Sequence, residues 1–263
     1  MKYIPFIILM SLTSFSLYGQ IANNDYFIYD DSINTDYEAL IEKSEEKSKI
    51  TVNARATFVS RFIWRGLELG DQPHFQPEVT FGWNNFFVGA WASHALSPVA
   101  FDESIPGYKE VIPYIGYTFN FTSSSSLDVL IMDHYNPNFQ NFGDWDDEGR
   151  GGNTIELRTI LKAGNFDFLG SVNLYNDTEH SAYLEFGYNF KLPNDFNVRP
   201  LVSLTPMESP FNGTDDFAFT QVGVITSKDI KITDHFTVPV KVDFIVNPEL
   251  DKFYTAFGFG IVF

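Results

Sequence analysis

Two segments of the chain end in residues whose side chains could carry out nucleophilic chemistry. Ser93 and His94 are neighbours at the end of one segment, and His134 closes another. A serine nucleophile needs a histidine base within hydrogen-bond reach, and a carboxylate commonly orients that base. Successive side chains of a strand point to opposite faces, so Ser93 cannot use His94, and His134 is the one conceivable base. A hydrolase acting on lipid is therefore an alternative, but we expect plain rim residues and no enzyme.

A second candidate for chemistry is the acidic stretch DWDDEGRGGN, which begins at Asp144. Asp144, Asp146 and Glu148 have the spacing of the first half of a calcium loop, but Ile155 occupies the position where a bidentate carboxylate is needed. The chain has no Cys, which excludes disulfides and thiolate metal sites. We therefore expect a solvated acidic loop, with no metal and no cofactor.

The elements that carry these residues are predicted to be strands. Polar and apolar residues alternate with a period of two through most of the chain after residue 48. Most of the alternating runs have the length, about nine to eleven residues, that a tilted strand needs to cross a bilayer. About twelve runs are predicted, at residues 50–61, 75–83, 86–94, 109–120, 127–134, 153–163, 166–175, 181–190, 196–205, 216–226, 230–244 and 252–263.

The connections between these runs alternate between long polar segments and short turns. Asn84-Asn85 and Gly164-Asn165 are turns of the primed hairpin types, and residues 227–229 are predicted as another short turn. Residues 62–74 and 135–152 are two of the long connections. Long extracellular loops on one rim and short periplasmic turns on the other are typical of an up-and-down outer-membrane barrel. A Greek-key sandwich has no reason to alternate in this way.

The last predicted strand has one face of large apolar side chains and one face of small side chains. Phe253, Phe257 and Phe259 share the large face, whereas Ala256 and Gly258 share the small face. Aromatic residues make up 17% of the chain, as expected for a wall that meets lipid through aromatic girdles. An exposed apolar face of this size would make a soluble protein aggregate, so a soluble secreted β-sandwich that binds a ligand remains an alternative only. We predict an all-β transmembrane barrel of about twelve antiparallel strands, in contact with outer-membrane lipid and lipopolysaccharide.

The N-terminal residues predict export. Residues 1–19 combine an early lysine, a short apolar stretch and a small-residue exit, which is typical of a secretory signal peptide. Residues 20–48 form an acidic N-terminal extension, and residues 49–263 form the predicted barrel. The chain ends on Phe263, and a terminal aromatic resembles the signal by which barrel-assembly machinery recognises outer-membrane proteins. We expect no nucleic-acid partner.

The stretch from Ser60 to Ser93 reads SRFIWRGLELGDQPHFQPEVTFGWNNFFVGAWAS. It resembles the opening of the TorF family of porin-like proteins, which has an aromatic-rich Arg-Gly turn, a Pro and a Gln before its second strand, and a GFYVGVWGS-like third strand. Trp64-Arg65-Gly66, Gln76-Pro77 and the run Phe86 to Ser93 occupy those places here, and HYNP at His134 is similar to a later family motif. The resemblance implies an outer-membrane barrel with a channel role and no catalytic residues.

Arg65 and Gly66 lie just past the first predicted strand. We expect Gly66 to supply a positive backbone φ angle in a turn. Arg65 is expected to anchor its loop either to a carboxylate of the protein or to anionic lipopolysaccharide, and the carboxylate anchor is the preferred interpretation.

The polar faces of the predicted strands are expected to point into the lumen. Their seven acids and six bases nearly cancel, so we predict cross-lumen ion pairs and a constricted pore. The predicted lumen-lining residues are Arg55, Arg61, Glu78, Glu110, Asp128, Glu156, Arg158, Lys162, Asp167, Glu185, Arg199, Lys241 and Asp243. Asp144, Asp146, Asp147 and Glu148 are predicted to raise the local cation concentration at the mouth. The predicted function is a porin-like passive channel for small solutes or ions, narrow and weakly cation-selective.

Overall fold

The computed structural model describes residues 50–98, 107–138, 141–146, 151–233 and 236–262. The predicted signal peptide, the acidic extension, Asp147, Glu148 and Phe263 lie outside the described residues. Within those ranges the chain is almost entirely β-structure, with one short 3-10 turn, η2 (Pro210–Asn212). No helix in the described part of the chain is long and apolar enough to cross a membrane.

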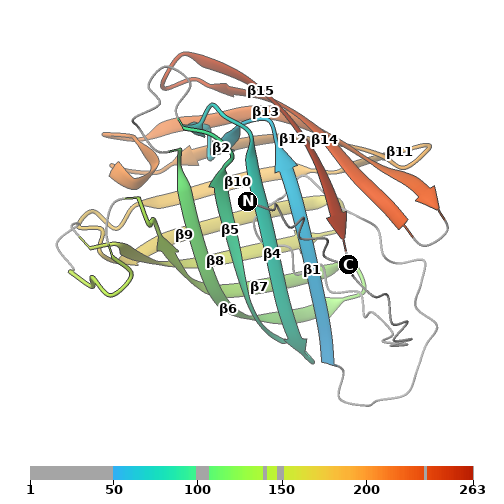
Figure 1. Ribbon diagram of the computed structural model, residues 1–263, viewed down its shortest axis with the longest axis horizontal. Helices are drawn as coiled ribbons and strands as arrows, with labels where there is room; N and C mark the ends of the chain where they lie inside the picture. The colour runs from blue at the N-terminus through green and yellow to red at the C-terminus, as the bar shows by residue number, and fades with distance from the viewer. Residues whose placement is uncertain (1–49, 99–106, 139–140, 147–150, 234–235, 263) are drawn as a thin grey trace, which may run out of the picture.

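Twelve strands of the described chain pair antiparallel with their neighbours in one closed ring (Figure 1). In ring order they are β10 (Ala182–Tyr188), β9 (Phe166–Tyr175), β8 (Asn153–Ala163), β7 (Ser125–Tyr135), β6 (Lys109–Thr122), β5 (Phe86–Ala95), β4 (His74–Trp83), β1 (Ile50–Val59), β15 (Lys252–Val262), β14 (Phe236–Asn247), β13 (Ala218–Thr233) and β12 (Phe196–Thr205). β12 pairs back with β10, and the short β11 (Phe190–Leu192) pairs with β12 next to it. The predicted up-and-down barrel is confirmed, and a β-sandwich is excluded by the closure of the ring.

Closure brings the first and last strands of the barrel together. β1 pairs with β15 from Arg55 opposite Val262 to Val59 opposite Gly258. A closed ring pairs the backbone groups of both its ends, which is the arrangement that lipid requires, because lipid offers no hydrogen-bond partners. The fold therefore satisfies the backbone without water along its wall.

The alternation of side chains produces an apolar outer wall. In β15, Phe253, Phe257 and Phe259 are exposed on the outer face. Ala256 and Gly258 lie between them and are buried on the inner face, as predicted. The outer side of this strand therefore carries exposed apolar side chains, and its inner side carries small buried residues.

Aromatic rings gather on the outer surface at the rim formed by the short turns. Phe86 contacts Tyr117 at a ring-centroid distance of 4.7 Å, and Phe166 contacts Tyr188 at 4.6 Å. Trp83 is exposed at the same rim, beside the Asn84 turn. These rings have the position of the interfacial girdle that membrane barrels present to lipid headgroups.

The turn predicted at residues 227–229 was wrong. These residues lie within β13, where Ser227 pairs with Lys241 and Asp229 pairs with Pro239 of β14. Ser227 is buried on the inner face, and Ile230 continues the exposed outer face. Ser227 and Asp229, which suggested a turn, therefore share the inward face of a longer strand, and Lys228 between them lies over the exposed ring of Phe196.

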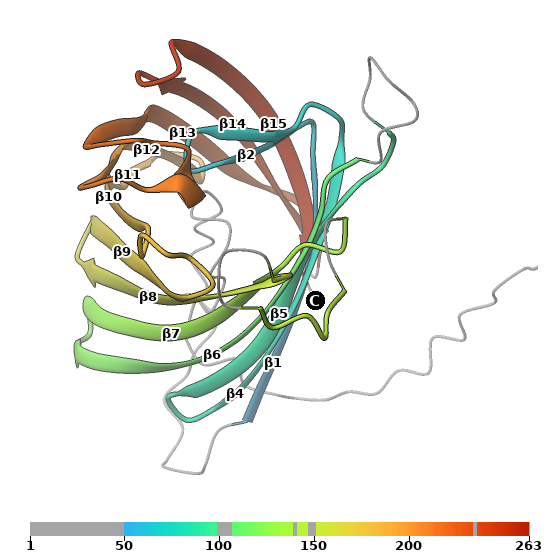
Figure 2. The ribbon, with the colours of Figure 1, turned by 90° about the vertical axis from the view of Figure 1, so that its left-hand side faces the viewer.

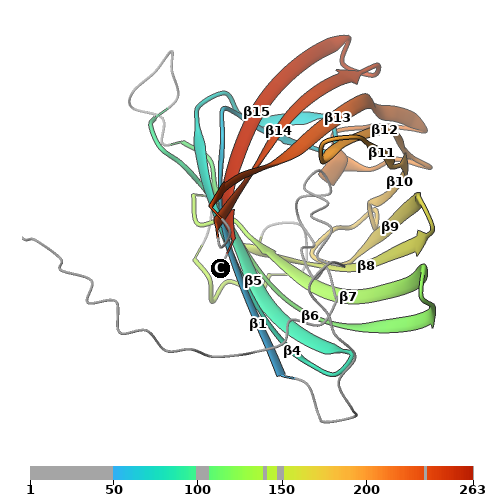
Figure 3. The same ribbon diagram turned by 90° about the vertical axis from the view of Figure 1, so that its right-hand side faces the viewer.

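The first long connection was predicted to be an extracellular loop, and this was wrong. It forms a hairpin of β2 (Phe62–Trp64) and β3 (Leu67–Gly70), which lies inside the ring of strands (Figures 2 and 3). Phe62 is 5% exposed and contacts Trp91 of β5. Leu69 packs against the buried apolar cluster to which Phe62 and Trp91 belong. A connection with this much apolar surface gains free energy by folding inward, away from water.

The interior of the barrel is apolar on one side. Inward side chains of β5 to β10, together with Phe62 of the hairpin, form one buried cluster. Its members are Phe62, Phe87, Trp91, Ile112, Tyr114, Leu130, Met132, Ile160, Leu169 and Tyr183. The sequence-based prediction of charged inner faces did not include this packed cluster, which gives the hairpin a surface to dock on.

Candidate functional site in the barrel lumen

The tip of the β2–β3 hairpin reaches the wall at β13 and β14. The carbonyl of Gly66 accepts a hydrogen bond of 2.9 Å from the side-chain amide of Asn247. A Cβ atom on Gly66 would lie 1.9 Å from the carbonyl oxygen of Thr220, and the φ angle of Gly66 is 83°. Glycine is needed here both for the positive φ, which confirms the prediction, and for the close approach of the two backbones.

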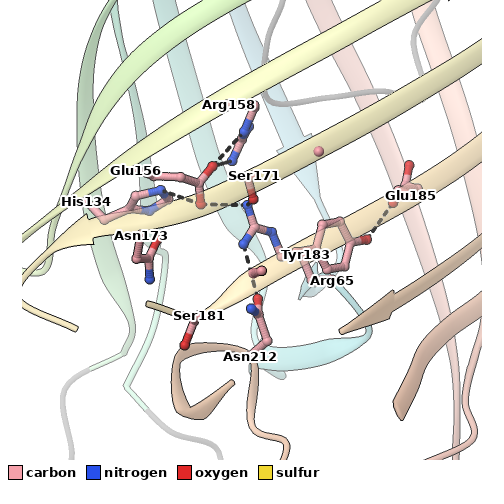
Figure 4. Close-up of polar contacts among 12 residues, drawn as sticks. Arg65, His134, Glu156, Arg158, Ser171, Asn173, Ser181, Tyr183, Glu185 and Asn212 are labelled. Carbon is pink, nitrogen blue, oxygen red and sulfur yellow. Dashed lines mark hydrogen bonds and ion pairs between the residues drawn. The ribbon is translucent and has the colours of Figure 1, made fainter. Parts of the chain in front are cut away.

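Arg65 joins the tip of the hairpin to the wall on the far side of the lumen (Figure 4). Its Nη2 atom donates to Glu156 Oε2 on β8 at 2.6 Å and to Ser171 Oγ on β9 at 3.0 Å. Its Nη1 atom donates to Asn212 Oδ1 in η2 at 3.1 Å. The predicted anchoring of Arg65 to a carboxylate is confirmed, and the carboxylate lies 91 residues further along the chain.

Two aromatic rings enclose the guanidinium of Arg65. The ring centroid of Trp64 lies 4.4 Å from its Cζ atom, and that of Tyr183 lies 4.5 Å from it. Such cation–π contacts are stronger when water is excluded, as it is around this group, which is 8% exposed. The rings therefore stabilise the guanidinium in its buried position.

Glu156 is the shared acceptor of this network. Arg158 donates to Glu156 Oε1 from Nε at 2.8 Å and from Nη2 at 2.7 Å. The Nε2 atom of His134 lies 3.5 Å from Glu156 Oε2, and its Nδ1 atom lies 3.0 Å from Glu110. The side chain of Glu156 is fully buried, so its charge depends on these partners.

A second ionic network lies nearer the turn rim, within the wall itself. Arg199 on β12 pairs with Asp167 on β9 and, at 2.8 Å, with Glu185 on β10. Glu185 also accepts a hydrogen bond of 2.6 Å from Tyr183. These carboxylates and the guanidinium come from adjoining strands, and therefore hold neighbouring parts of the ring together.

Three further contacts that involve predicted lumen residues lie on other strands. Arg55 pairs with Glu78 at 2.9 Å, and Lys241 pairs with Asp243 at 3.3 Å. Asp128 accepts a hydrogen bond of 2.6 Å from Thr118. The inner faces of β1, β4, β7 and β14 thus carry charges whose partners lie on the same or the adjoining strand.

Two predicted lumen residues have different surroundings. Arg61 lies past the end of β1 and pairs with Glu68 of β3 at 2.8 Å, with a side chain that is 36% exposed. Lys162 is half-buried near the turn end of β8. Arg61 therefore belongs to the base of the hairpin and not to the wall of the barrel.

The described acids of the long loop lie beside the wall and not above its opening. The carbonyl of Asp144 accepts a hydrogen bond from Asn153, whose partner across the strands is Tyr135 on the outer face of β7. Asp146 belongs to the same segment. Glu148, the third member of the calcium-loop pattern, lies outside the described residues, as does Asp147.

The Ser93–His134 pair considered for catalysis is not formed. Ser93 Oγ lies 2.8 Å from Nδ1 of His74 and accepts a hydrogen bond of 3.3 Å from Gln76. His134 contacts the two carboxylates of Glu110 and Glu156 instead. His74 and Ser93 come from adjoining strands of the wall, so a cross-strand contact of this kind needs no catalytic role.

A family model described as "Bacterial protein of unknown function (Gcw_chp)" matches residues 43–231. The chain belongs to the Gcw_chp family. The matched region of this Gcw_chp chain contains the hairpin, η2 and the ring strands from β1 to β12. The finer resemblance to the TorF family stays a prediction. A comparison with curated proteins found no match.

Solved structures of porins are similar to this Gcw_chp chain in outline. The KdgM porin is 9% identical, with a TM-score of 0.49, and the match covers 81% of this chain and 98% of that one. The NanC porin is also 9% identical, with a TM-score of 0.48 over 81% of this chain and 98% of that one.

The sequence of the first long connection has the pattern of a hairpin. Phe62, Trp64, Leu67 and Leu69 are apolar residues on either side of an Arg-Gly turn, which is a hairpin pattern in a segment interpreted as a loop. The partners of its tip, Asn212 and Asn247 among them, had no such signal, because only the closed ring brings them near Arg65.

Proposed function

We propose that this Gcw_chp protein is an outer-membrane porin-like passive channel for small solutes or ions, narrowed by the β2–β3 hairpin. The observation that carries the proposal is the docking of Arg65 against Glu156, which holds the hairpin across the inside of a closed barrel. A closed ring with an apolar outer wall is suited to lipid, and charged inner faces are suited to polar solutes. No catalytic role is part of the proposal.

The hairpin supports the predicted narrowness of the channel. Barrels of about twelve strands are already narrower than the 16-stranded porins. The hairpin contacts β5 through Phe62, β8 through Arg65 and β14 through Gly66, so it occupies part of the cross-section near the loop rim. We therefore expect a small unitary conductance.

Single-channel recording of refolded protein in planar bilayers tests this proposal. The comparison variant replaces Ile63–Leu69 with a short Gly-Ser linker, and we expect its conductance to be several-fold larger than that of the native protein. Arg65→Ala removes only the anchor and is expected to give an intermediate increase with more frequent current fluctuations. Arg61→Ala is the matched control, because Arg61 is an exposed cation of the same segment, and it should leave the conductance unchanged.

Two results would contradict the proposal in different ways. If neither the native protein nor the linker variant conducts, while both fold by circular dichroism and by heat-dependent gel migration, the channel function fails. If both conduct equally, the protein is a channel but the hairpin is not its constriction.

Weak cation selectivity is part of the proposal and has a separate measurement. The formal net charge of the chain is −17, and an acidic surface raises the local cation concentration at low salt. Reversal potentials should favour cations at low salt and lose that preference near 1 M salt, where the screening length is about 3 Å. Asp144 lies beside the wall, and Asp146 belongs to the same segment. Neutralising both together with Asp147 and Glu148 is therefore expected to change the reversal potential only slightly. A reversal potential of the native protein that shows a preference for anions would contradict the proposal.

Export and assembly are proposed from the sequence. Residues 1–19 would direct secretion, and Phe263 would be recognised by barrel-assembly machinery. Deleting Phe263 in a Gram-negative host should lower the amount of heat-modifiable protein in the outer-membrane fraction. An undiminished amount would remove this role from the terminal aromatic.

A further inference from the structure

The segment Asn141–Asp146, from the connection between β7 and β8, covers the outside of the barrel wall. Its position follows from strand register. Tyr135 is opposite Asn153, four pairs beyond Ile131 and Leu157. Directly paired residues of antiparallel strands share a face, and every second pair returns to the same face, so Asn153 lies on the face of Ile131. Ile131 is 40% exposed on the outer wall, whereas Asn153 on the same face is fully buried. The part of the protein that covers Asn153 must therefore lie outside the ring of strands.

Hydrogen bonds identify the covering chain. The side-chain amide of Asn153 donates to the carbonyl of Phe142 at 2.8 Å and to that of Asp144 at 3.2 Å. Tyr175, the last residue of β9, pairs with Ile155 of β8 and donates from its hydroxyl to the carbonyl of Trp145. The segment is thus fixed by three of its carbonyl groups to the outer surface of β8 and β9.

This attachment presents two large aromatic side chains on the outside of the loop rim. Phe142 packs edge-on against Tyr135 with ring centroids 5.2 Å apart, and Trp145 packs against Tyr175 at 6.0 Å. Phe142 nevertheless remains 57% exposed and Trp145 remains 47% exposed. The four rings form a surface, the rim aromatic patch, which continues the apolar outer wall of β7 and β8 beyond its last exposed residue, Ile131.

We propose that the rim aromatic patch binds membrane lipid at the boundary between acyl chains and headgroups of the outer leaflet. The proposal rests on the membrane placement given above, and its occupant follows from continuity with the lipid-facing wall. Trp and Tyr favour this boundary, because one part of each side chain is apolar and another part makes hydrogen bonds. Asp144 and Asp146 belong to the same segment as the patch, and their polar side chains suit the headgroup side of this boundary. The segment Asn141–Asp146 of the β7–β8 connection is therefore a lipid anchor.

Site-directed labelling can test this assignment without background, since the chain has no Cys. Phe142→Cys and Trp145→Cys are each labelled with a nitroxide, and the protein is refolded into vesicles of phosphatidylcholine and phosphatidylglycerol. Relaxation by oxygen, which concentrates in lipid, is compared with relaxation by a water-soluble nickel chelate. Val88→Cys provides the lipid-exposed control on the outer wall, and Glu179→Cys provides the water-exposed control on another connection at the loop rim.

Lipid binding predicts an accessibility to oxygen at residues 142 and 145 that lies close to the value at residue 88. Accessibility to the nickel chelate should be several-fold lower than at residue 179. If both labels behave like residue 179, the patch faces water and the proposal is overturned. If neither reagent reaches them, protein covers the patch, and a second copy or another protein replaces lipid as the occupant. A label at residue 88 that oxygen does not reach would overturn the membrane placement as well, so the two failures are distinguishable.

Discussion

Two buried arginines in the barrel have similar partners but hold different parts of the molecule. Arg199 of β12 pairs with carboxylates on β10, its neighbour in the ring, and on β9, the next strand beyond β10. Arg65 pairs with a carboxylate on β8, although its own hairpin pairs only with itself, β2 with β3. The first ion pair joins strands that backbone hydrogen bonds already fix. The second is a main attachment of a hairpin that would be marginally stable alone.

The comparison shows that the same buried ion pair has different consequences in the two places. Breaking the Arg199 network, formed by Arg199, Asp167 and Glu185, should affect the stability of the wall and leave the lumen unchanged. Breaking the Arg65 network, formed by Arg65, Glu156, Arg158 and His134, should free the hairpin and so change the lumen itself. The following changes test this difference, in order of decreasing expected effect.

Glu156→Ala should have the largest effect on stability. It leaves the guanidiniums of both Arg65 and Arg158 without their shared carboxylate, in a place where the two arginine side chains are only 5% and 4% exposed. Removing one partner of a buried ion pair costs about 3 to 5 kcal/mol. Urea unfolding of the refolded protein in detergent would measure the loss, and single-channel recording should show a larger conductance. A loss below about 1 kcal/mol would show that the carboxylate does not hold the network together.

Val240→Arg should have the next largest effect, for a reason that involves neither network. Val240 points outward from the middle of β14, next to the inward Lys241. An arginine at the lipid-facing midplane of a barrel costs about 2 to 4 kcal/mol. Lys241→Ala is the matched control and should change the free energy of unfolding far less. If the order of the two is reversed in refolding titrations, the faces of the barrel are assigned the wrong way round.

Asp167→Asn should have a smaller effect, because Arg199 keeps Glu185 as its second partner. Asp167 is also partly exposed, with a side chain that is 16% accessible, so water replaces some of the lost interaction. We expect a loss of about 1 to 2 kcal/mol in the same unfolding measurement. The conductance should remain that of the native channel. A rise in conductance equal to that of Glu156→Ala would abolish the distinction between the two networks.

Arg61→Ala should have the smallest effect. The pair of Arg61 with Glu68 is exposed on both sides, at 36% and 28% of the side-chain surface. Exposed pairs of this kind contribute about 0 to 1 kcal/mol. Thermal unfolding in 0.1 M and 1 M salt would detect any contribution as a salt-dependent difference. A loss above about 2 kcal/mol would show that the base of the hairpin, and not its tip, holds it in the lumen.

Most of the wall could be predicted from the sequence, because the alternation of side chains and the turn residues are local properties of each strand. Phe253, Phe257 and Phe259 alternate with small residues, and this period of two decides which side of β15 faces outward whatever the neighbouring strands are. Asn84 and Gly164 end strands through backbone preferences of the residues themselves: Asn84 has a φ of 54° and Gly164 a φ of 61°. The wrong turn prediction at residues 227–229 also comes from this reliance on local pattern. A polar residue on the inward face of a strand looks the same, in the local sequence, as a polar residue of a turn.

The contents of the lumen were decided by tertiary structure. The sequence predicted that Arg65 needs an anion and that Gly66 needs a positive φ, but it did not say which carboxylate or which backbone they meet. Glu156 and Asn247 lie far along the chain from the hairpin, and only ring closure and strand register bring them to its tip. Alternation is a property of neighbouring residues and is readable from the chain. A contact across the lumen depends on the diameter and stagger of the whole ring, to which every strand contributes.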